Sequence, residues 1–131
     1  MGAFAGDALT DAGTNVAMGT NALSTDTKGS RSVAIGQNAL QTQNFTSATQ
    51  SYNTAVGYQA GNSITTARWN THIGGLAGQT VNTGHYNTGL GYNAGGSITT
   101  GQQNTSIGMN SGDAVTTGSV SYTHLTLPTK A

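Results

Sequence analysis

A nine-residue phrase that returns about every 17 residues constrains this chain more than any other feature. The phrase "NTAVGYQAG" at 53–61 comes back as "NTHIGGLAG" at 70–78. Aligned on the aliphatic residue before the glycine, the copies follow one another in steps of 17, 21, 17, 17 and 17, at Met18, Ile35, Val56, Ile73, Leu90 and Ile107. A further step back reaches Met1, so the sequence contains seven copies, the first cut in half. Such periods are typical of solenoids.

Four positions of the repeat have a constant character. A glycine follows the aliphatic residue every time, at Gly2, Gly19, Gly36, Gly57, Gly74, Gly91 and Gly108. A β-branched residue stands two before it, at Val16, Val33, Thr54, Thr71, Thr88 and Thr105. A small residue stands four after it, at Ala5, Ala22, Ala39, Ala60, Ala77, Ala94 and Ser111. A second aliphatic residue stands eight after it in most copies, at Leu9, Ile64, Val81, Ile98 and Val115.

This pattern predicts an all-β fold, a parallel β-roll or β-solenoid of about seven repeats of about 17 residues. The β-branched and aliphatic residues are two apart and share one face of a short strand. Val16 and Val33 suggest that this face points inward, which would leave His72, at the intervening position, facing solvent. A second short strand is expected at "SITT" or "AVTT", and the glycine is expected to permit a special backbone conformation or a close approach.

The predicted core is thin, which favours association of several copies. One Val or Ile and one Ala per turn bury little area, and small cores rarely stabilise a chain unaided. The chain has no Cys that could form a disulfide. We therefore expect a homo-oligomer.

The pattern also predicts where the array ends. We expect residues 1–119 to form a repeat array truncated at both ends, in which Met1 is an internal residue of a longer array. Val120–Thr129, "VSYTHLTLPT", breaks the pattern and contains the single Pro. It resembles a translated frame of the transposon-end adapter used in sequencing libraries, so residues 120–131 are interpreted as a non-native tail. The alternative is a C-terminal cap that covers the last turn.

The charge content argues against several function classes. Only 6% of the residues are charged and the formal net charge is zero, so we expect no nucleic-acid partner. No apolar run approaches the length of a membrane span, so no membrane insertion is expected in this segment. The groups available for catalysis are few and scattered along the repeat: Asp7, Asp11, Asp26, Asp113, His72 and His85. We predict no enzymatic activity, no cofactor and no metal site; a glycan-cleaving solenoid would need acidic side chains gathered in one groove.

Candidate binding residues lie in the variable segment just before each phrase. Aromatic and planar polar side chains on solenoid turns can form a recognition surface. The candidates are Arg68, Trp69, His85, Tyr86, Gln102 and Gln103, together with Tyr58 and Tyr92 at another shared position. The alternative is that these residues only pack against neighbouring turns or subunits.

The Thr position suggests one further function class. A flat ladder of Thr54, Thr71, Thr88 and Thr105 would be similar to ice-binding surfaces if it faced outward. Because Val16 and Val33 occupy the same position, we expect this ladder to face inward, which would exclude that version of the ice-binding hypothesis.

The segments "NVAMGTNAL", "SVAIGQNAL" and "NTAVGYQAG" resemble the head repeats of YadA-like trimeric autotransporter adhesins. They are even more similar to the "NTAVGYQAG…ITTG" arrays of phage tail-fibre and virion structural proteins of environmental origin. The resemblance implies a left-handed parallel β-roll, a homotrimer, and an adhesive or spacer role. The expected function is host-receptor binding or spacing in a phage tail fibre on the virion, with a cell-surface glycan or protein as receptor. The alternative is a bacterial adhesin head on the outer-membrane surface.

Overall fold

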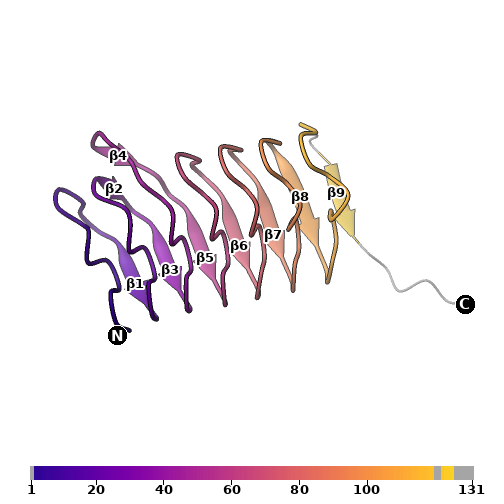
Figure 1. The fold of residues 1–131 in the computed structure, drawn as a ribbon. Helices are drawn as coiled ribbons and strands as arrows, with labels where there is room; N and C mark the ends of the chain where they lie inside the picture. The colour runs from indigo at the N-terminus through magenta and orange to yellow at the C-terminus, as the bar shows by residue number, and fades with distance from the viewer. Residues whose placement is uncertain (1, 120–121, 126–131) are drawn as a thin grey trace, which may run out of the picture.

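The computed structural model describes residues 2–119 and 122–125, which form a parallel β-solenoid of about five turns without a helix. Figure 1 shows the strands as a row of parallel arrows from β1 at the N-terminal end to β9 at the other, with a loop closing each turn. The prediction of an all-β solenoid is therefore confirmed. The count of seven repeats stays a prediction, because Met1 lies outside the described residues and no strand precedes β1 in them.

One strand per turn builds the main sheet, in the order β1-β3-β5-β6-β7-β8-β9. The bounds are β1 Val16–Met18, β3 Val33–Ile35, β5 Thr54–Val56, β6 Thr71–Ile73, β7 Thr88–Leu90, β8 Asn104–Ile107 and β9 Tyr122–Leu125. Every pair is parallel, and the pairs from β1 to β8 are in the register of the repeat, so that Val56 lies beside Ile73 and Ile73 beside Leu90. A second sheet pairs β2 Gly29–Ser30 with β4 Thr49–Gln50.

The prediction of which strand side chains face the interior is wrong. The residue between the β-branched and aliphatic positions faces the interior, as Ala34, Ala55 and His72 do. The aliphatic residues point outward, and Ile73 and Leu90 are exposed. Thr54, Thr71, Thr88 and Thr105 share that outward face and are half-buried. His72 is correspondingly a core residue.

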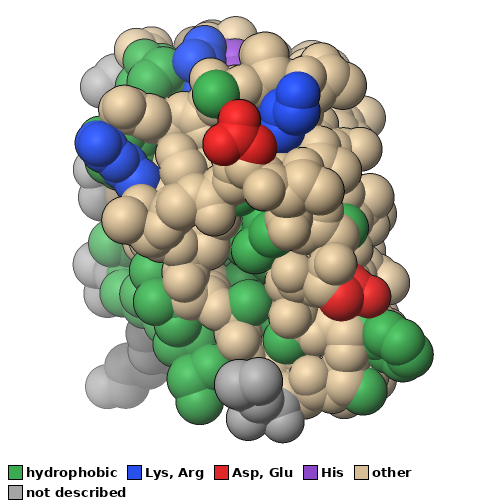
Figure 2. Space-filling view, turned by 90° about the vertical axis from the view of Figure 1, so that its left-hand side faces the viewer, with side chains coloured by type: hydrophobic (Ala, Val, Ile, Leu, Met, Phe, Trp, Pro, Cys, Tyr) green, Lys and Arg blue, Asp and Glu red, His purple; other side chains and the backbone are tan. Residues whose placement is uncertain are grey.

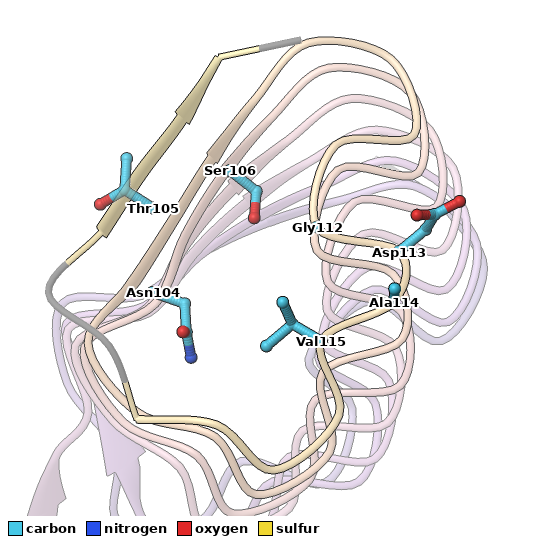
Figure 3. Close-up of a pocket in the computed structure, with 7 residues that line it drawn as sticks. All are labelled: Asn104, Thr105, Ser106, Gly112, Asp113, Ala114 and Val115. Carbon is cyan, nitrogen blue, oxygen red and sulfur yellow. The ribbon is translucent and has the colours of Figure 1, made fainter.

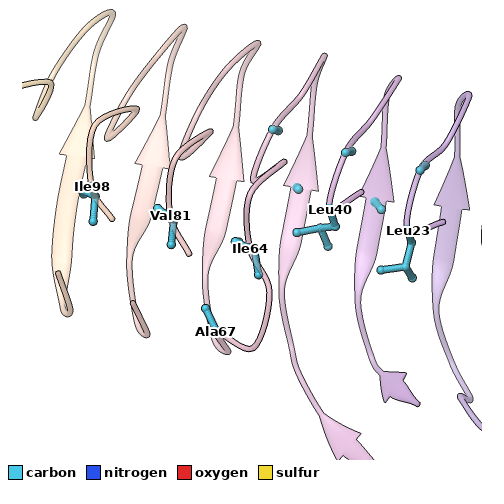
Figure 4. Close-up of a cluster of buried hydrophobic side chains, with 11 residues drawn as sticks. Leu23, Leu40, Ile64, Ala67, Val81 and Ile98 are labelled. Atoms are coloured by element: carbon cyan, nitrogen blue, oxygen red, sulfur yellow. The ribbon is translucent and has the colours of Figure 1, made fainter. Parts of the chain in front are cut away.

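The reason for this orientation is that the interior of the coil is narrow. A Cβ atom added to inward-facing Gly89 would lie 2.6 Å from the Ala94 carbonyl oxygen on the opposite wall. Small side chains therefore suit this strand position in every turn except that of His72, and the larger Val, Ile and Leu side chains fit outside. The core cluster contains the Ala residues of both walls, and Figure 4 shows one larger apolar side chain per turn running along the coil: Leu23, Leu40, Ile64, Val81 and Ile98.

That larger side chain occupies either of two positions, five or eight residues after the strand aliphatic. Leu23 and Leu40 use the first position, and their turns carry buried Asp26 and Gln43 at the second. The other turns place Gly at the first position and Leu, Ile or Val at the second. An added Cβ at Gly61 would lie 3.0 Å from both Leu40 and Ile64, so the space that the glycine leaves is already filled. The filled volume thus stays similar from turn to turn.

The expected second strand is not formed at "SITT" or "AVTT". These segments bond to the next turn by single backbone hydrogen bonds, such as Thr65 N to Asn82 O at 3.1 Å and Asn82 N to Thr99 O at 2.9 Å. Positive φ angles two and four residues after each repeat glycine, and again just before each strand, bend the backbone on either side of these segments. A continuous ladder is therefore restricted to the three or four residues of the main strand.

A buried ladder of Asn side chains connects successive turns just before each strand. The Oδ1 atom of Asn70 accepts the Asn87 backbone N–H at 2.8 Å, and its Nδ2 donates to the Gly84 carbonyl at 3.0 Å. Asn53 and Asn87 repeat both bonds with their own neighbours. These bonds satisfy backbone groups at the corner where the strand begins, where no sheet bond is available.

The C-terminal segment was interpreted as a non-native tail. Tyr122–Leu125 forms β9, which pairs in parallel with β8 so that Thr105 lies beside Thr123. This pairing is what a cap would do, but an open sheet edge also pairs with any extended segment. Its backbone position therefore does not distinguish the two interpretations, and residues 120–121 and 126–131 lie outside the described ones.

The repeat glycines allow the turns to approach closely, as predicted, and Gly74 offers a test. Its φ is +133°, and an added Cβ would lie 2.3 Å from the Gly91 carbonyl oxygen. We expect Gly74→Ala to lower the free energy of unfolding by roughly 3 kcal/mol or more, because the strain and the clash cannot relax without separating two turns.

The matched control is Gly75→Ala, whose added Cβ meets nothing closer than the Tyr92 ring at 3.5 Å. Its effect in thermal unfolding should stay within about 1 kcal/mol. Equal melting temperatures for the two variants would contradict the close-approach argument.

Candidate functional site

Most of the predicted binding residues gather on one edge of the solenoid, at the corner before each strand. We call Arg31, Tyr52, Arg68, Trp69, His85 and Tyr86 the aromatic edge. Its members occupy two adjacent positions of the repeat in successive turns, joined by backbone bonds such as Tyr86 N to Arg68 O at 3.2 Å and Trp69 N to Ser51 O at 2.8 Å. The prediction that Arg68, Trp69, His85 and Tyr86 lie together is consistent with this geometry.

The side chains of the aromatic edge are stacked along the coil. The Trp69 and Tyr86 rings are parallel within 1°, with centroids 4.9 Å apart. The Arg68 Cζ atom lies 4.4 Å from the Trp69 ring centroid, and the Arg31 Cζ atom lies 5.3 Å from that of Tyr52. His85 meets Trp69 edge-on at 6.1 Å. Each guanidinium is thus held against a ring by a cation–π contact.

The backbone under these side chains is left-handed. Tyr52, Trp69 and Tyr86 have φ angles of 49°, 58° and 60°, a region that favours Gly or Asn and disfavours bulky residues. The corner needs this conformation in every turn, since Thr14, Arg31 and Gln103 at the same position share it. Ring stacking, worth about 0.5–1.5 kcal/mol per pair, offsets part of the backbone cost.

His85 carries a hydrogen bond that defines its tautomer. Its Nδ1 atom accepts the Arg68 backbone N–H at 3.0 Å, so the proton of the neutral ring is on Nε2. Partial burial, followed by the positive charge of Arg68, lowers the pKa of His85 below its usual value. His85 is therefore neutral at physiological pH and offers one N–H donor beside the Arg68 guanidinium.

The remaining predicted residues are placed differently. Gln102 and Gln103 continue the edge by one turn and are exposed, with Gln103 N bonded to His85 O at 3.1 Å. Tyr58 and Tyr92 follow the strands instead of preceding them, so they belong to the other end of the sheet. The Tyr92 ring packs over Gly75, in the turn between the two tyrosines.

Arg31 and Tyr52 were missed in the sequence, although the repeat contains the signal that finds them. Each stands four residues before its strand aliphatic, the position of Trp69 and Tyr86. The 21-residue step obscured this correspondence. The Arg31 guanidinium bonds the Gln50 Oε1 atom at 3.2 Å and also the Tyr52 hydroxyl, both uncharged groups.

His72 was predicted to face solvent, and its burial is the reverse of that expectation. It is 1% exposed, and neither ring nitrogen has a hydrogen-bond partner. The ring fits where other turns hold Ala because Gly78 and Gly89 leave space for it; an added Cβ would lie 2.4 Å and 2.9 Å from its Nδ1 atom. Burial lowers the pKa of His72 from 6.5 to about 4. This histidine fills space and is not accessible to a ligand.

A cavity of about 130 Å³ opens at the C-terminal end of the coil. Asn104, Ser106 and Val115 point into the interior of the last turn, as Figure 3 shows, while Asp113 points away from it. It is part of the core space of the coil, because its inward-pointing lining residues occupy the same repeat positions as the core residues of the other turns.

Within residues 2–119 and 122–125, no group of three His, Cys, Asp or Glu side chains could hold a metal ion. The same residues contain no helix with the length and hydropathy to cross a membrane. Asp26 is buried and accepts bonds from Gly29 N at 2.9 Å and Gln43 Nε2 at 2.6 Å, so its carboxylate is engaged inside the fold.

Comparisons with protein-family profiles, with curated proteins and with solved structures found no match to this chain.

The buried His72 predicts a specific pH dependence of stability. Its pKa is about 4 in the folded chain against 6.5 as the ordinary value, so between these values the unfolded chain binds more protons. The free energy of unfolding should therefore fall as the pH drops from about 6.5 to about 4, by up to about 3 kcal/mol from this residue.

The matched variant is His72→Ala, which restores the residue found at this position in Ala17, Ala34 and Ala55. Urea unfolding of both proteins between pH 7 and pH 4 measures the difference in slope. An unchanged pH dependence in the variant would contradict the assignment.

Proposed function

We propose that this chain is a segment of a fibrous, homotrimeric surface protein that attaches to a host receptor or spaces the domain that does. The assignment we favour is a phage tail fibre on the virion, folded as a left-handed β-roll. The alternative is the head of a YadA-like trimeric adhesin on a bacterial outer membrane. Genes beside the complete reading frame would separate the two, since an adhesin requires an outer-membrane anchor domain and a tail fibre neighbours other virion genes.

The observation that carries the proposal is the apolar, uncharged outer face of the main sheet. Val16, Met18, Ile73 and Leu90 are 43%, 49%, 39% and 45% exposed. The outward strand positions of the main sheet from β1 to β8 form two rows, one of aliphatic residues and one of Val and Thr. Neither row contains a charged residue. Exposed aliphatic side chains gathered on one uncharged face are typical of an interface.

Symmetry explains why copies of the same chain suit this face. Because the strands are parallel and in register, residues at the same repeat position form rows along the coil. Coils packed around a shared parallel axis bring each row against the corresponding rows of its neighbours at the same height. The association then supplies the apolar burial that the Ala-rich interior lacks.

The distribution of acidic groups supports a binding or spacer role over catalysis. Asp26 is buried and hydrogen-bonded within the fold, and Asp113 lies in the last described turn. Asp7 and Asp11 are both exposed in the first described turn, away from the cavity at the C-terminal end. Paired carboxylates of a glycosidase must lie within about 5–10 Å of each other. We therefore propose no catalytic role for this segment.

Sizing by light scattering tests the trimer. The full chain should run as a trimer, and Leu90→Lys should give a folded monomer, because it places a charge in the apolar face without entering the core of the coil. Thr83→Lys adds the same charge at an exposed position outside that face and should remain trimeric. A stably folded wild-type monomer would refute the proposal.

The outward Thr row revives a second candidate, an ice-binding surface. Thr54, Thr71, Thr88 and Thr105 form a row beside the aliphatic residues on the same regular sheet. The same face cannot bind ice and be buried in a trimer. This candidate therefore predicts a monomer with thermal hysteresis that Thr88→Lys removes and Thr83→Lys keeps; a trimer without hysteresis would exclude it.

A further inference from the structure

We propose that the aromatic edge binds an acidic polysaccharide, with the Arg68 guanidinium as its principal anion contact and Arg31 as the second. The inference rests on the proposed attachment function and names the class of ligand.

Positive charge is concentrated on this side of the coil. The described cations are Lys28, Arg31 and Arg68, all in segments between strands. Figure 2 shows the blue groups in the upper part of this face, with one acidic group among them and a second one lower down. Lys28 has an acidic neighbour, since Asp11 occupies the same repeat position one turn before it and the backbones bond there. Arg68 lies further along the coil. Its repeat position holds His85 in the next turn and carries no carboxylate in the neighbouring turns.

The Arg68 guanidinium is ordered without using its donors. Its Cζ atom lies over Trp69, and because Tyr86 stacks on that ring at 4.9 Å, the guanidinium occupies the opposite face. Among the described residues, the hydrogen bonds of Arg68 involve its backbone only. A guanidinium held in place with free N–H groups can grip a carboxylate or sulfate bidentately at low entropic cost.

The ring arrangement argues against a neutral sugar stacked on Trp69, the ring beside Arg68. Stacking of a sugar needs an open aromatic face, and Trp69 has one face on Arg68 and the other on Tyr86. Besides the exposed parts of the Tyr52, Trp69 and Tyr86 rings, the edge carries polar groups: the Arg68 guanidinium, the His85 Nε2–H donor, and the exposed amides of Gln102 and Gln103. These groups match an anionic substituent flanked by hydroxyl groups.

The spacing favours a polymer over a single sugar. Arg31 belongs to the corner two turns before Arg68, so at about 4.8 Å per turn their backbones are about 10 Å apart along the coil. A chain lying along the edge can therefore meet both guanidinium groups. In a trimer, three such edges would raise the overall affinity through multivalency.

The experiment measures binding of the full chain to immobilised polygalacturonate, which carries carboxylates, and dextran sulfate, with uncharged dextran as the reference. We expect binding to at least one polyanion, weakened by salt, and none to dextran. Arg68→Gln should weaken it about tenfold or more and Arg31→Gln by a smaller factor, since a hydrogen bond to a charged group is lost.

Lys28→Gln is the matched control, because it removes the same charge from the turn of Arg31, two turns before Arg68, without touching the stack. It should change the affinity less than twofold. Equal losses in Lys28→Gln and Arg68→Gln, equal binding to dextran, or tighter binding to duplex DNA than to either polysaccharide would overturn the proposal.

Sizing in parallel separates this inference from the proposed function. A trimer that binds neither polyanion would refute the acidic ligand and leave the fibre assignment intact. A monomer that binds through Arg68 would refute the trimer and leave the ligand assignment standing.

Discussion

The distance between successive turns governs which residue each position of this chain can hold. Parallel strands lie about 4.8 Å apart, so every turn must present its backbone to the next at that spacing. At Gly57 and Gly74 the approach leaves no room for a Cβ atom. At Asn70 and Asn87 a side-chain amide replaces the missing sheet bonds. This one spacing therefore explains why the same residue types return at these positions of the repeat.

The repeat made the architecture predictable, but not which face of its strands is buried. Period, register and the need for glycine follow from positions that hardly vary, and the structure agrees with them. Inside and outside were exchanged because alternation in a strand identifies two faces without saying which is buried. The size of the side chains held the answer, since Ala34 and Ala55 fit a narrow interior and Ile73 and Leu90 do not. His72 was predicted on the wrong face for the same reason. The space that Gly78 and Gly89 leave for its ring can be recognised only once the coil is closed.

The candidate site was predictable in its location and not in its chemistry. Equivalent positions of a repeat meet in neighbouring turns, which is why Trp69 and Tyr86 were grouped from the sequence. Whether their rings would offer open faces depends on the left-handed corner backbone and on where Arg68 lies, and neither can be obtained from spacing. Tyr58 and Tyr92 share a repeat position as well, yet Gly75 falls between them and the strand separates them from the aromatic edge.

The asparagine ladder has a consequence for how such proteins change length. The Oδ1 atom of each buried amide accepts the backbone N–H of the next Asn in the row, as Asn53 does from Asn70 and Asn70 does from Asn87. Adding or deleting one whole repeat leaves every such bond with an equivalent partner, whereas a partial repeat breaks the series. The length of the coil is therefore adjustable by gene duplication in increments of about 4.8 Å, while its cross-section stays constant.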